Sequence, residues 1–232
     1  MKIIAHRCGT DVYEEQTISA ARHSLALGAD MVEVDIRFTA DNVPVVIHDP
    51  TTDKLYGIAA KVDEITAAEF LSMRRIADPS VCGHTFAHYI QCGIKPMLFH
   101  NKVGGKRLHI VLDMCREAGL LDQVTFGVVN PEDACLVKAY GDISVLAFMK
   151  SPELIGAFAD AGADYLRLWQ HWCSEENIAA VKAAGRKLWI MSNYNGMVGE
   201  VSGEACYQFY RSVGAEGVLV NVIEPAVRYY NK

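Results

Sequence analysis

The chain has 232 residues, 51% of them apolar, and a formal net charge of −6 with acidic and basic residues interspersed. That length permits one large domain or two small ones. Because no block of basic residues occurs, the sequence argues against a nucleic-acid partner, and any bound anion is expected to be held by a few placed residues.

The cysteines and the first residues indicate a cellular compartment. Seven cysteines are scattered along the chain, an odd number without the spacing of a disulfide framework, so we expect free thiols in a reducing cytoplasm. The chain begins with a strand and lacks the apolar segment and cleavage site of a signal peptide. No apolar run is long enough to span a bilayer. We therefore expect a soluble cytoplasmic protein without stable membrane insertion, either monomeric or a homo-oligomer.

Short strand-like runs alternate with amphipathic stretches along the whole chain. The predicted strands are residues 1–5, 31–36, 43–47, 96–99, 124–129, 143–148, 165–168, 187–190 and 217–220. The predicted helices lie near residues 16–28, 106–119, 131–140, 151–161, 175–184 and 203–213. Asn130-Pro131 and Ser151-Pro152 mark two helix starts, because each pairs an N-cap residue with proline at the first helical position.

This alternation favours a particular fold. Repeated β–α units indicate parallel strands covered by helices, and about eight of them favour a closed (β/α)8 TIM barrel, typically ~250 residues long. The alternative, an open doubly wound sheet, usually has a glycine-rich phosphate loop after its first strand, whereas this strand leads into His6-Arg7-Cys8-Gly9. Residues 50–95 break the rhythm. We interpret them as an insertion over the barrel mouth, within a single domain of residues 1–232.

Charged residues follow or interrupt the first three predicted strands. His6-Arg7 ends the first, Glu33 and Asp35 lie inside the second, and His48-Asp49 ends the third. Side chains two residues apart on a strand share a face, with Cα atoms about 6–7 Å apart. Buried strands rarely hold ionised groups unless these are paired or bind a metal. Two carboxylates on one face, with imidazoles and a guanidinium nearby, predict a metal-assisted acid–base site for an anionic substrate.

Four segments in residues 3–70 carry a resemblance to a known family, and they are Ile4–Gly9, Gly28–Arg37, Asp41–Thr51 and Ile65–Glu69. Weaker matches continue to the C-terminus at Trp189–Asn193 and Gly214–Leu219. In this order the segments resemble the glycerophosphodiester phosphodiesterase family. The resemblance implies a TIM barrel with a small insertion after the second strand. It also implies hydrolysis of glycerophosphodiesters to glycerol 3-phosphate and an alcohol, with a divalent cation.

The resemblance also implies roles for individual residues. By position, His6 and His48 correspond to the acid–base pair of the family and Arg7 to its phosphate-binding arginine. Glu33 and Asp35 correspond to metal ligands. Around neutrality one imidazole can accept a proton from the nucleophile while the other protonates the leaving alkoxide.

Other positions match the family only in part. Glu15 corresponds to the glutamate of a Pro-Glu-Asn-Thr segment, which here reads Glu14-Glu15-Gln16-Thr17. We expect Glu15 either to hydrogen-bond in the site, for example to Arg7, or to be an exposed acid at a helix start. The family's third strand usually ends in Glu-x-Lys, and here His100-Asn101-Lys102 stands there. Lys102 corresponds to the lysine of Glu-x-Lys, which the resemblance implies binds substrate. Cys8 stands where the family usually has the glycine of His-Arg-Gly.

His100 bears on the identity of the metal. The resemblance implies one divalent ion, Mg²⁺ or Ca²⁺, which oxygen-only sites suit. An imidazole ligand moves the preference toward Mn²⁺ or Zn²⁺. His100 is therefore expected either to complete the metal site with Glu33 and Asp35, or to leave that position to water or a substrate hydroxyl.

Three further residues lie near the ends of predicted strands. Arg167 lies near a strand end and is expected either to bind a second anionic or hydroxyl group of the substrate or to form a surface salt bridge. Trp189 is expected to pack in the barrel wall, with Asn193 near the mouth.

A short segment of the insertion has helical spacing of possible zinc ligands. His84, His88 and Cys92 recur at four-residue intervals, so a structural zinc site is one option. An ordinary lid helix capped by Thr85 is favoured, with its aromatic residues over the barrel mouth or against a partner subunit.

The sequence thus predicts a phosphoric diester hydrolase of lipid and glycerol metabolism that acts on a small-molecule glycerophosphodiester. Two alternatives stay open. One is a phospholipase D-like lyase on the same barrel, which releases a cyclic phosphate. The other is a phosphodiester-binding barrel that has lost catalysis, which the residue at position 100 and the altered 14–16 segment motivate.

Overall fold

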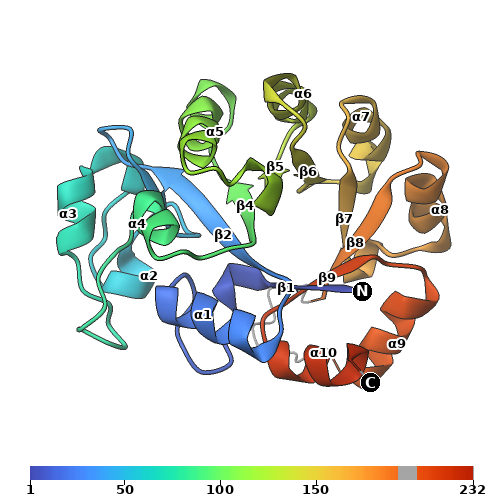
Figure 1. The fold of residues 1–232 in the computed structure, drawn as a ribbon, viewed down its shortest axis with the longest axis horizontal. Helices are drawn as coiled ribbons and strands as arrows, with labels where there is room; N and C mark the ends of the chain where they lie inside the picture. The colour runs from blue at the N-terminus through green and yellow to red at the C-terminus, as the bar shows by residue number, and fades with distance from the viewer. Residues whose placement is uncertain (193–202, 232) are drawn as a thin grey trace.

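The computed structural model describes residues 1–192 and 203–231, in which a ring of strands lies inside a ring of helices (Figure 1). Asn193 lies outside the described residues. The barrel strands are β1 (Lys2–Ala5), β2 (Met31–Phe38), β4 (Met97–Asn101), β5 (Val124–Val128), β6 (Ser144–Ala147), β7 (Tyr165–Trp169), β8 (Lys187–Met191) and β9 (Gly217–Val220). They pair in parallel in the order β1-β9-β8-β7-β6-β5-β4-β2, and β2 pairs again with β1. The predicted closed (β/α)8 barrel is confirmed.

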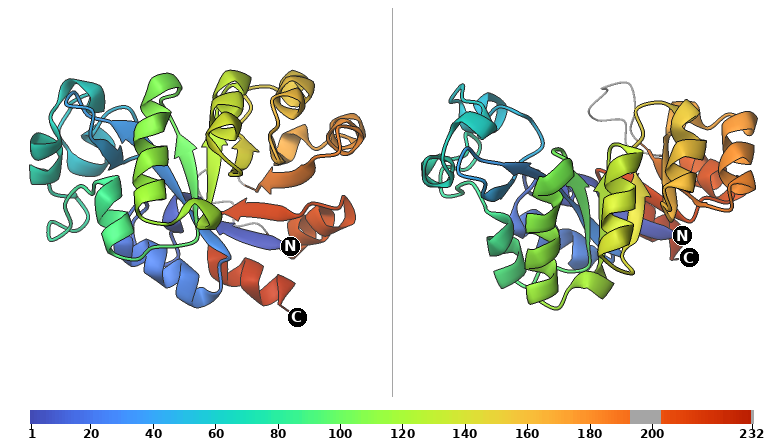
Figure 2. Two further views of the ribbon diagram at one scale, coloured as in Figure 1. Left: turned by 45° about the horizontal axis from the view of Figure 1, so that its top comes forward. Right: turned by 90° about the horizontal axis from the view of Figure 1, so that it is seen from above.

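Helices follow the barrel strands and cover their outer faces (Figure 2). They are α1 (Ile18–Leu27), α4 (Phe86–Gln91), α5 (Leu108–Glu117), α6 (Pro131–Tyr140), α7 (Ile155–Asp160), α8 (Glu175–Ala183), α9 (Glu204–Ser212) and α10 (Ile223–Tyr230). The Asn130 side chain accepts from the Asp133 amide and caps α6 as the sequence predicts. The pattern does not predict α10, because its N-cap residue is Val222, whose side chain cannot cap a helix.

The inside of the barrel is apolar at one end and charged at the other. An apolar cluster fills the interior and consists of Ile4, Met31, Leu98, Leu146, Phe148, Trp189, Met191 and Leu219. Trp189, for which we expect packing in the barrel wall, lies in this interior cluster. Alternate residues of a strand face opposite sides of the sheet, so Glu33 and Asp35 share the inward face of β2 with Met31. They follow Met31 along the strand, which places them toward its carboxyl end, the face that carries the sites of TIM-barrel enzymes.

The insertion after the second barrel strand has its own small core. It starts at β3 (Pro44–Val46), which pairs antiparallel with β2 and is not a barrel strand, and it contains α2 (Asp53–Tyr56) and α3 (Ala67–Ser72). Its apolar cluster is Val45, Ile47, Leu55, Tyr56, Val62, Phe70 and Met73. Figures 1 and 2 show this part of the chain projecting to one side of the barrel.

The helix α4 differs from the expectation of a lid. Phe86 and Tyr89 are fully buried in the layer between strands and helices. Phe86 packs edge-on against Phe99 of β4 with ring centroids 4.9 Å apart. Because Phe99 belongs to that outer layer, α4 covers the outside of the barrel and does not close its mouth.

Two further expectations concern the whole chain. All seven cysteines are free. None of the helices in the described part of the chain combines the length and apolar character needed to cross a membrane.

Candidate active site

A tight turn after β1 carries the first two site residues. The 3-10 segment η1 (His6–Cys8) has Arg7 at φ 52° and Cys8 at φ 70°, both in the left-handed region. Gly9 follows at φ 82°, where a Cβ would lie 2.2 Å from the Ser24 hydroxyl oxygen, so only glycine fits. The Ser24 hydroxyl donates to the Cys8 carbonyl at 2.7 Å. This turn aims the Arg7 amide at Glu33, to whose Oε2 it donates at 2.7 Å.

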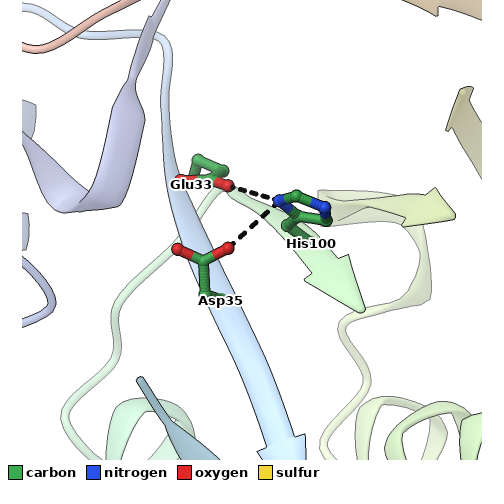
Figure 3. A group of neighbouring side chains, drawn as sticks. All are labelled: Glu33, Asp35 and His100. Atoms are coloured by element: carbon green, nitrogen blue, oxygen red, sulfur yellow. Dashed lines mark ion pairs between the residues drawn. The ribbon is translucent and has the colours of Figure 1, made fainter. Parts of the chain in front are cut away.

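Glu33, Asp35 and His100 form a compact group (Figure 3). Both carboxylates are fully buried, and Nδ1 of His100 lies 3.4 Å from Glu33 Oε1 and 3.1 Å from Asp35 Oδ1. One ligand atom from each of the three residues lies within 4.8 Å of the other two. The barrel places them together because residues 35 and 100 are register partners in the β2–β4 pair.

Charges around this group set its protonation. Burial raises the pKa of Glu33, and the neighbouring Asp35 adds to the effect. Burial opposes ionisation of Asp35 too, but Lys102 and His100 outweigh it and hold the pKa of Asp35 well below its usual range. Lys102 Nζ lies 2.9 Å from Asp35 Oδ1. Burial, with Lys102 next, lowers the pKa of His100 to about 4, so this imidazole is neutral at pH 7.

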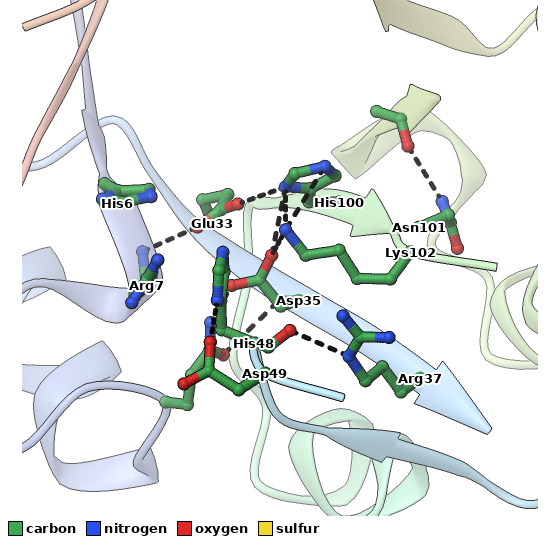
Figure 4. A network of polar contacts seen from close by, with 12 residues as sticks. His6, Arg7, Glu33, Asp35, Arg37, His48, Asp49, His100, Asn101 and Lys102 are labelled. Atoms are coloured by element: carbon green, nitrogen blue, oxygen red, sulfur yellow. Dashed lines mark hydrogen bonds and ion pairs between the residues drawn. The ribbon is translucent and has the colours of Figure 1, made fainter. Parts of the chain in front are cut away.

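The two imidazoles proposed for proton transfer are each fixed by one hydrogen bond. Nδ1 of His6 donates to Asn221 Oδ1 at 2.6 Å, and Nδ1 of His48 donates to Asp49 Oδ1 at 2.6 Å. Both bonds use Nδ1, so Nε2 is the nitrogen that can act on a substrate. Burial is the main cause that lowers the pKa of both rings. Figure 4 shows both rings beside the acidic residues.

Two cations, Arg7 and Lys102, lie beside the carboxylates of Glu33 and Asp35. Arg7 pairs with Glu15 at 2.9 Å, and Lys54 of the insertion approaches the other Glu15 oxygen at 3.1 Å. Glu15 therefore bonds to Arg7 within the site and is not an exposed acid at a helix start. Lys102 Nζ lies 2.8 Å from His100 Nδ1 as well as close to Asp35 (Figure 4). Its ammonium therefore belongs to the same cluster.

Arg167 lies in the barrel interior and makes no surface salt bridge with the described residues. Its side chain is 4% exposed. One guanidinium nitrogen, NH2, donates weakly to the Met149 carbonyl at 3.4 Å, while Nε and NH1 have no hydrogen-bond partner. Burial lowers the pKa of Arg167 to about 9, against the pull of Glu33.

The structure brings three further residues to the site, and the sequence analysis notes only Gln16 among them, as a departure from the Pro-Glu-Asn-Thr segment. Gln16, fully buried at φ 59°, donates through Nε2 to Asp35 Oδ2 at 2.6 Å. Arg75 of the insertion, 1% exposed, donates to the Gln16 carbonyl at 3.2 Å. Asn221 follows β9 directly, so its place at the end of a barrel strand was the available signal. Arg75 had none, because the course of an insertion does not follow from strand periodicity.

The zinc site considered for the insertion is not supported by the described residues. His84 and His88 stack with ring centroids 5.2 Å apart. In the described part of the chain, the one group of His, Cys, Asp or Glu atoms close enough to share an ion is Glu33, Asp35 and His100.

That group fits a divalent cation by its chemistry. Glu33 Oε1 is buried and accepts no hydrogen bond. Buried carboxylate oxygens normally accept a hydrogen bond. An oxygen that accepts none and faces two other potential metal ligands is therefore suited to bind a cation. A neutral imidazole has one nitrogen with a free lone pair, so His100 can bind a cation through that nitrogen.

The closed parallel barrel defines a TIM-barrel protein. Its polar cluster lies at the carboxyl ends of the strands, the face that carries the active sites of TIM-barrel enzymes. A family model described as the glycerophosphoryl diester phosphodiesterase family matches residues 6–144. The chain belongs to this family.

Individual relatives match over shorter stretches. Glycerophosphodiester phosphodiesterase 1 of Bos taurus is 35% identical over 75 residues, 32% of this chain and 23% of that protein. The glycerophosphodiester phosphodiesterase of Caldanaerobacter subterraneus is 39% identical over 67 residues, 29% of this chain and 28% of that protein. A human lysophospholipase D is 32% identical over 68 residues, 29% of this chain and 22% of that protein. The matched stretch thus spans about a quarter of the length of these relatives.

Solved structures match over nearly the whole chain. The glycerophosphodiester phosphodiesterase from Agrobacterium tumefaciens aligns with a TM-score of 0.76 at 19% identity, covering 96% of this chain and 97% of that one. The enzyme of that name from Thermotoga maritima aligns with a TM-score of 0.77 at 17% identity, covering 97% and 96%. At such identities the likeness concerns the fold.

Proposed function

We propose that this protein hydrolyses glycerophosphodiesters to glycerol 3-phosphate and an alcohol, with one divalent metal ion. The observation that carries the proposal is the buried group of Glu33, Asp35 and His100 with two oriented imidazoles beside it. Family membership supports the substrate class, and the names of the relatives agree with it. We further propose that residues 1–232 form one domain that works in the cytoplasm, with which seven free thiols are consistent.

Glu33, Asp35 and His100 would hold the metal. When bound, it supplies positive charge against a phosphoryl oxygen and orients the diester. The three ligands carry a charge of −2, because His100 is neutral. Two carboxylates and one imidazole suit Mn²⁺ or Zn²⁺ better than they suit Ca²⁺, and Mg²⁺ is the family-based alternative.

Three basic side chains would bind the substrate. Arg7 presents a planar fork that matches two phosphate oxygens, and Glu15 orients that fork from 2.9 Å. Lys102 adds a point charge beside Asp35. These charges act most strongly on the transition state, where negative charge grows on the phosphoryl oxygens. Arg167, the middle residue of β7, would bind a second anionic or hydroxyl group of the substrate and not the scissile phosphate.

His6 and His48 would move the protons. Nε2 of one ring takes a proton from the attacking water, and Nε2 of the other protonates the alkoxide that leaves. The bonds to Asn221 and Asp49 fix the tautomer and the ring orientation, so each Nε2 is aimed before the substrate arrives.

Phosphorus NMR on metal-free protein tests the proposal. Glycerophosphocholine, -ethanolamine, -glycerol and -inositol are each supplied with Mg²⁺, Ca²⁺, Mn²⁺ or Zn²⁺. We expect glycerol 3-phosphate to appear with at least one of the cations and to stop appearing when a chelator is added. A cyclic phosphate as first product would instead identify a lyase. Binding of the diesters without turnover under any cation would identify a non-catalytic phosphodiester-binding barrel.

A further inference from the structure

A buried cation lies in the barrel apart from the acidic group. Arg167 is the middle residue of β7, between Tyr165 and Trp169, which pack with the interior apolar cluster. Its side chain therefore points into the barrel. It is 4% exposed, two of its nitrogens have no hydrogen-bond partner, and no carboxylate of the described residues pairs with it.

Aromatic rings surround this guanidinium. Its central carbon lies 4.4 Å from the ring centre of Trp169, 5.2 Å from that of Phe148 and 5.8 Å from that of Trp172. Ring faces attract a cation and stabilise it partly. They accept none of its directional hydrogen bonds, so the planar fork of Arg167 keeps donors to offer.

Phe148 connects this cation with the proposed metal group. Its ring stacks on His100 with centroids 3.8 Å apart and planes 3° from parallel. Gly127 makes room for that ring, because a Cβ there would lie 2.3 Å from Phe148 Cε2. Arg167 and His100 thus contact the same ring, which places the guanidinium within reach of a substrate held at the acidic residues.

The chemistry around Arg167 favours an anion. A buried charge without a counter-ion is costly, and an arriving oxyanion removes that cost without further desolvation of the arginine. Guanidinium matches carboxylate and phosphate oxygens with two parallel hydrogen bonds. The ring faces that could otherwise receive a quaternary ammonium already hold Arg167, so a cationic group is repelled.

We propose that Arg167 binds a second oxyanion, a carboxylate or phosphate on the alcohol portion of the diester, and that the preferred substrates carry this additional negative charge. The inference rests on the proposed function. The glycerol phosphate half is common to all glycerophosphodiesters, so only the alcohol can supply the second charge. Arg7 and Lys102 lie at the acidic residues and are placed for the scissile phosphate.

A matched pair of diesters tests this directly. Glycerophosphoglycerate differs from glycerophosphoglycerol by a carboxylate in place of one hydroxymethyl group. We expect the kcat/KM of the wild type to be at least about tenfold higher for the glycerate diester, as a charge-assisted hydrogen-bond pair supplies. Arg167→Met is expected to abolish the ratio and Arg167→Lys to keep part of it. Arg116→Met, on the exposed face of α5, serves as the control and should keep the full ratio.

Ligand binding gives a second readout that needs no turnover. Quenching of tryptophan fluorescence reports a ligand near Trp169 and Trp172. We expect 3-phosphoglycerate to bind at least about tenfold more tightly than glycerol 3-phosphate in the wild type, and equally in Arg167→Met. If Arg167→Met does not fold, the wild-type ratios and Arg167→Lys still decide.

The outcomes separate the two proposals. Hydrolysis of both diesters at equal kcat/KM, or a drop in Arg167→Met that is equal for both, overturns the oxyanion subsite and leaves the hydrolase proposal standing. Absence of hydrolysis together with tighter 3-phosphoglycerate binding overturns the hydrolase and supports the subsite. Equal binding of both ligands by the wild type overturns the subsite.

Discussion

The two sides of the barrel mouth treat their buried charges differently. On the side of β1, β2 and β4, Asp35 pairs with Lys102 and Arg7 with Glu15, so charges of opposite sign lie in contact. On the side of β6 and β7, Arg167 has aromatic rings and a weak carbonyl contact in place of a carboxylate. On the first side, ion pairs hold the charged side chains in place before a substrate binds. On the second side, the counter-ion of Arg167 would come from the ligand, so this side would discriminate between ligands.

Removing an imidazole on the first side should reduce turnover more than any other change. His6→Ala and His48→Ala should each lower kcat for every glycerophosphodiester by about 10²–10⁴-fold, because each removes one proton-transfer group. Thermal unfolding should show both variants folded. His109→Ala, which removes an exposed imidazole on α5, is the control and should keep full turnover. Full activity of either site variant would refute the assignment.

The next effect tests how firmly Asp35 is held. Gln16→Met removes the donor to Asp35 Oδ2 while keeping the length of the side chain. We expect Mn²⁺ affinity, measured by calorimetry on metal-free protein, to fall by roughly 10–100-fold, as for other groups that orient a metal ligand. Gln208→Met, on the exposed face of α9, is a matched control. Unchanged affinity in Gln16→Met would show that Asp35 needs no such support.

The ring between the two sides provides a stability test. Gly127→Ala places a methyl group 2.3 Å from Phe148 Cε2 and 2.5 Å from the Phe99 carbonyl oxygen, so backbone and ring must both move. Overpacking of this kind costs about 1–3 kcal/mol. We expect the melting temperature to fall by roughly 2–10 °C. Gly156→Ala on α7, where an added Cβ meets nothing within 4 Å, should not lower it.

A smaller effect concerns pH. The base imidazole must be neutral, so activity falls as pH drops through its pKa, and the acid imidazole must be protonated, so activity falls as pH rises through its pKa. Burial lowers the pKa of both His6 and His48 below 6.5, which moves both limbs to the acid side. We expect the maximum of kcat/KM below pH 6.5. A maximum above pH 7 would contradict these two roles.

Much of the fold follows from the sequence because each barrel strand is short, apolar and bounded by helix caps. The antiparallel pairing of residues 44–46 does not follow, since their apolar run looks like that of a barrel strand. The predicted position of α4 over the barrel mouth is also wrong, because the helix covers the outside of the barrel. Its aromatic residues suit either a mouth or a wall, and only contact with Phe99 distinguishes the two.

The site was predictable where residues follow strand ends. His6, Glu33, Asp35 and His100 lie on strands or directly after them, so parallel pairing alone brings them to one face. The partners that orient them come from elsewhere. Arg75 reaches Gln16 from the insertion across 59 residues of sequence, and no periodicity fixes such a contact.

Calorimetric titration of Mn²⁺ into metal-free protein shows whether Glu33, Asp35 and His100 bind a metal ion. We expect one ion per chain in the wild type and an affinity at least about 100-fold lower in Asp35→Asn, whose fold is checked by circular dichroism. Asp113→Asn, on the exposed face of α5, should bind like the wild type. Equal Mn²⁺ affinity in Asp35→Asn and the wild type would contradict a metal centre at Glu33, Asp35 and His100.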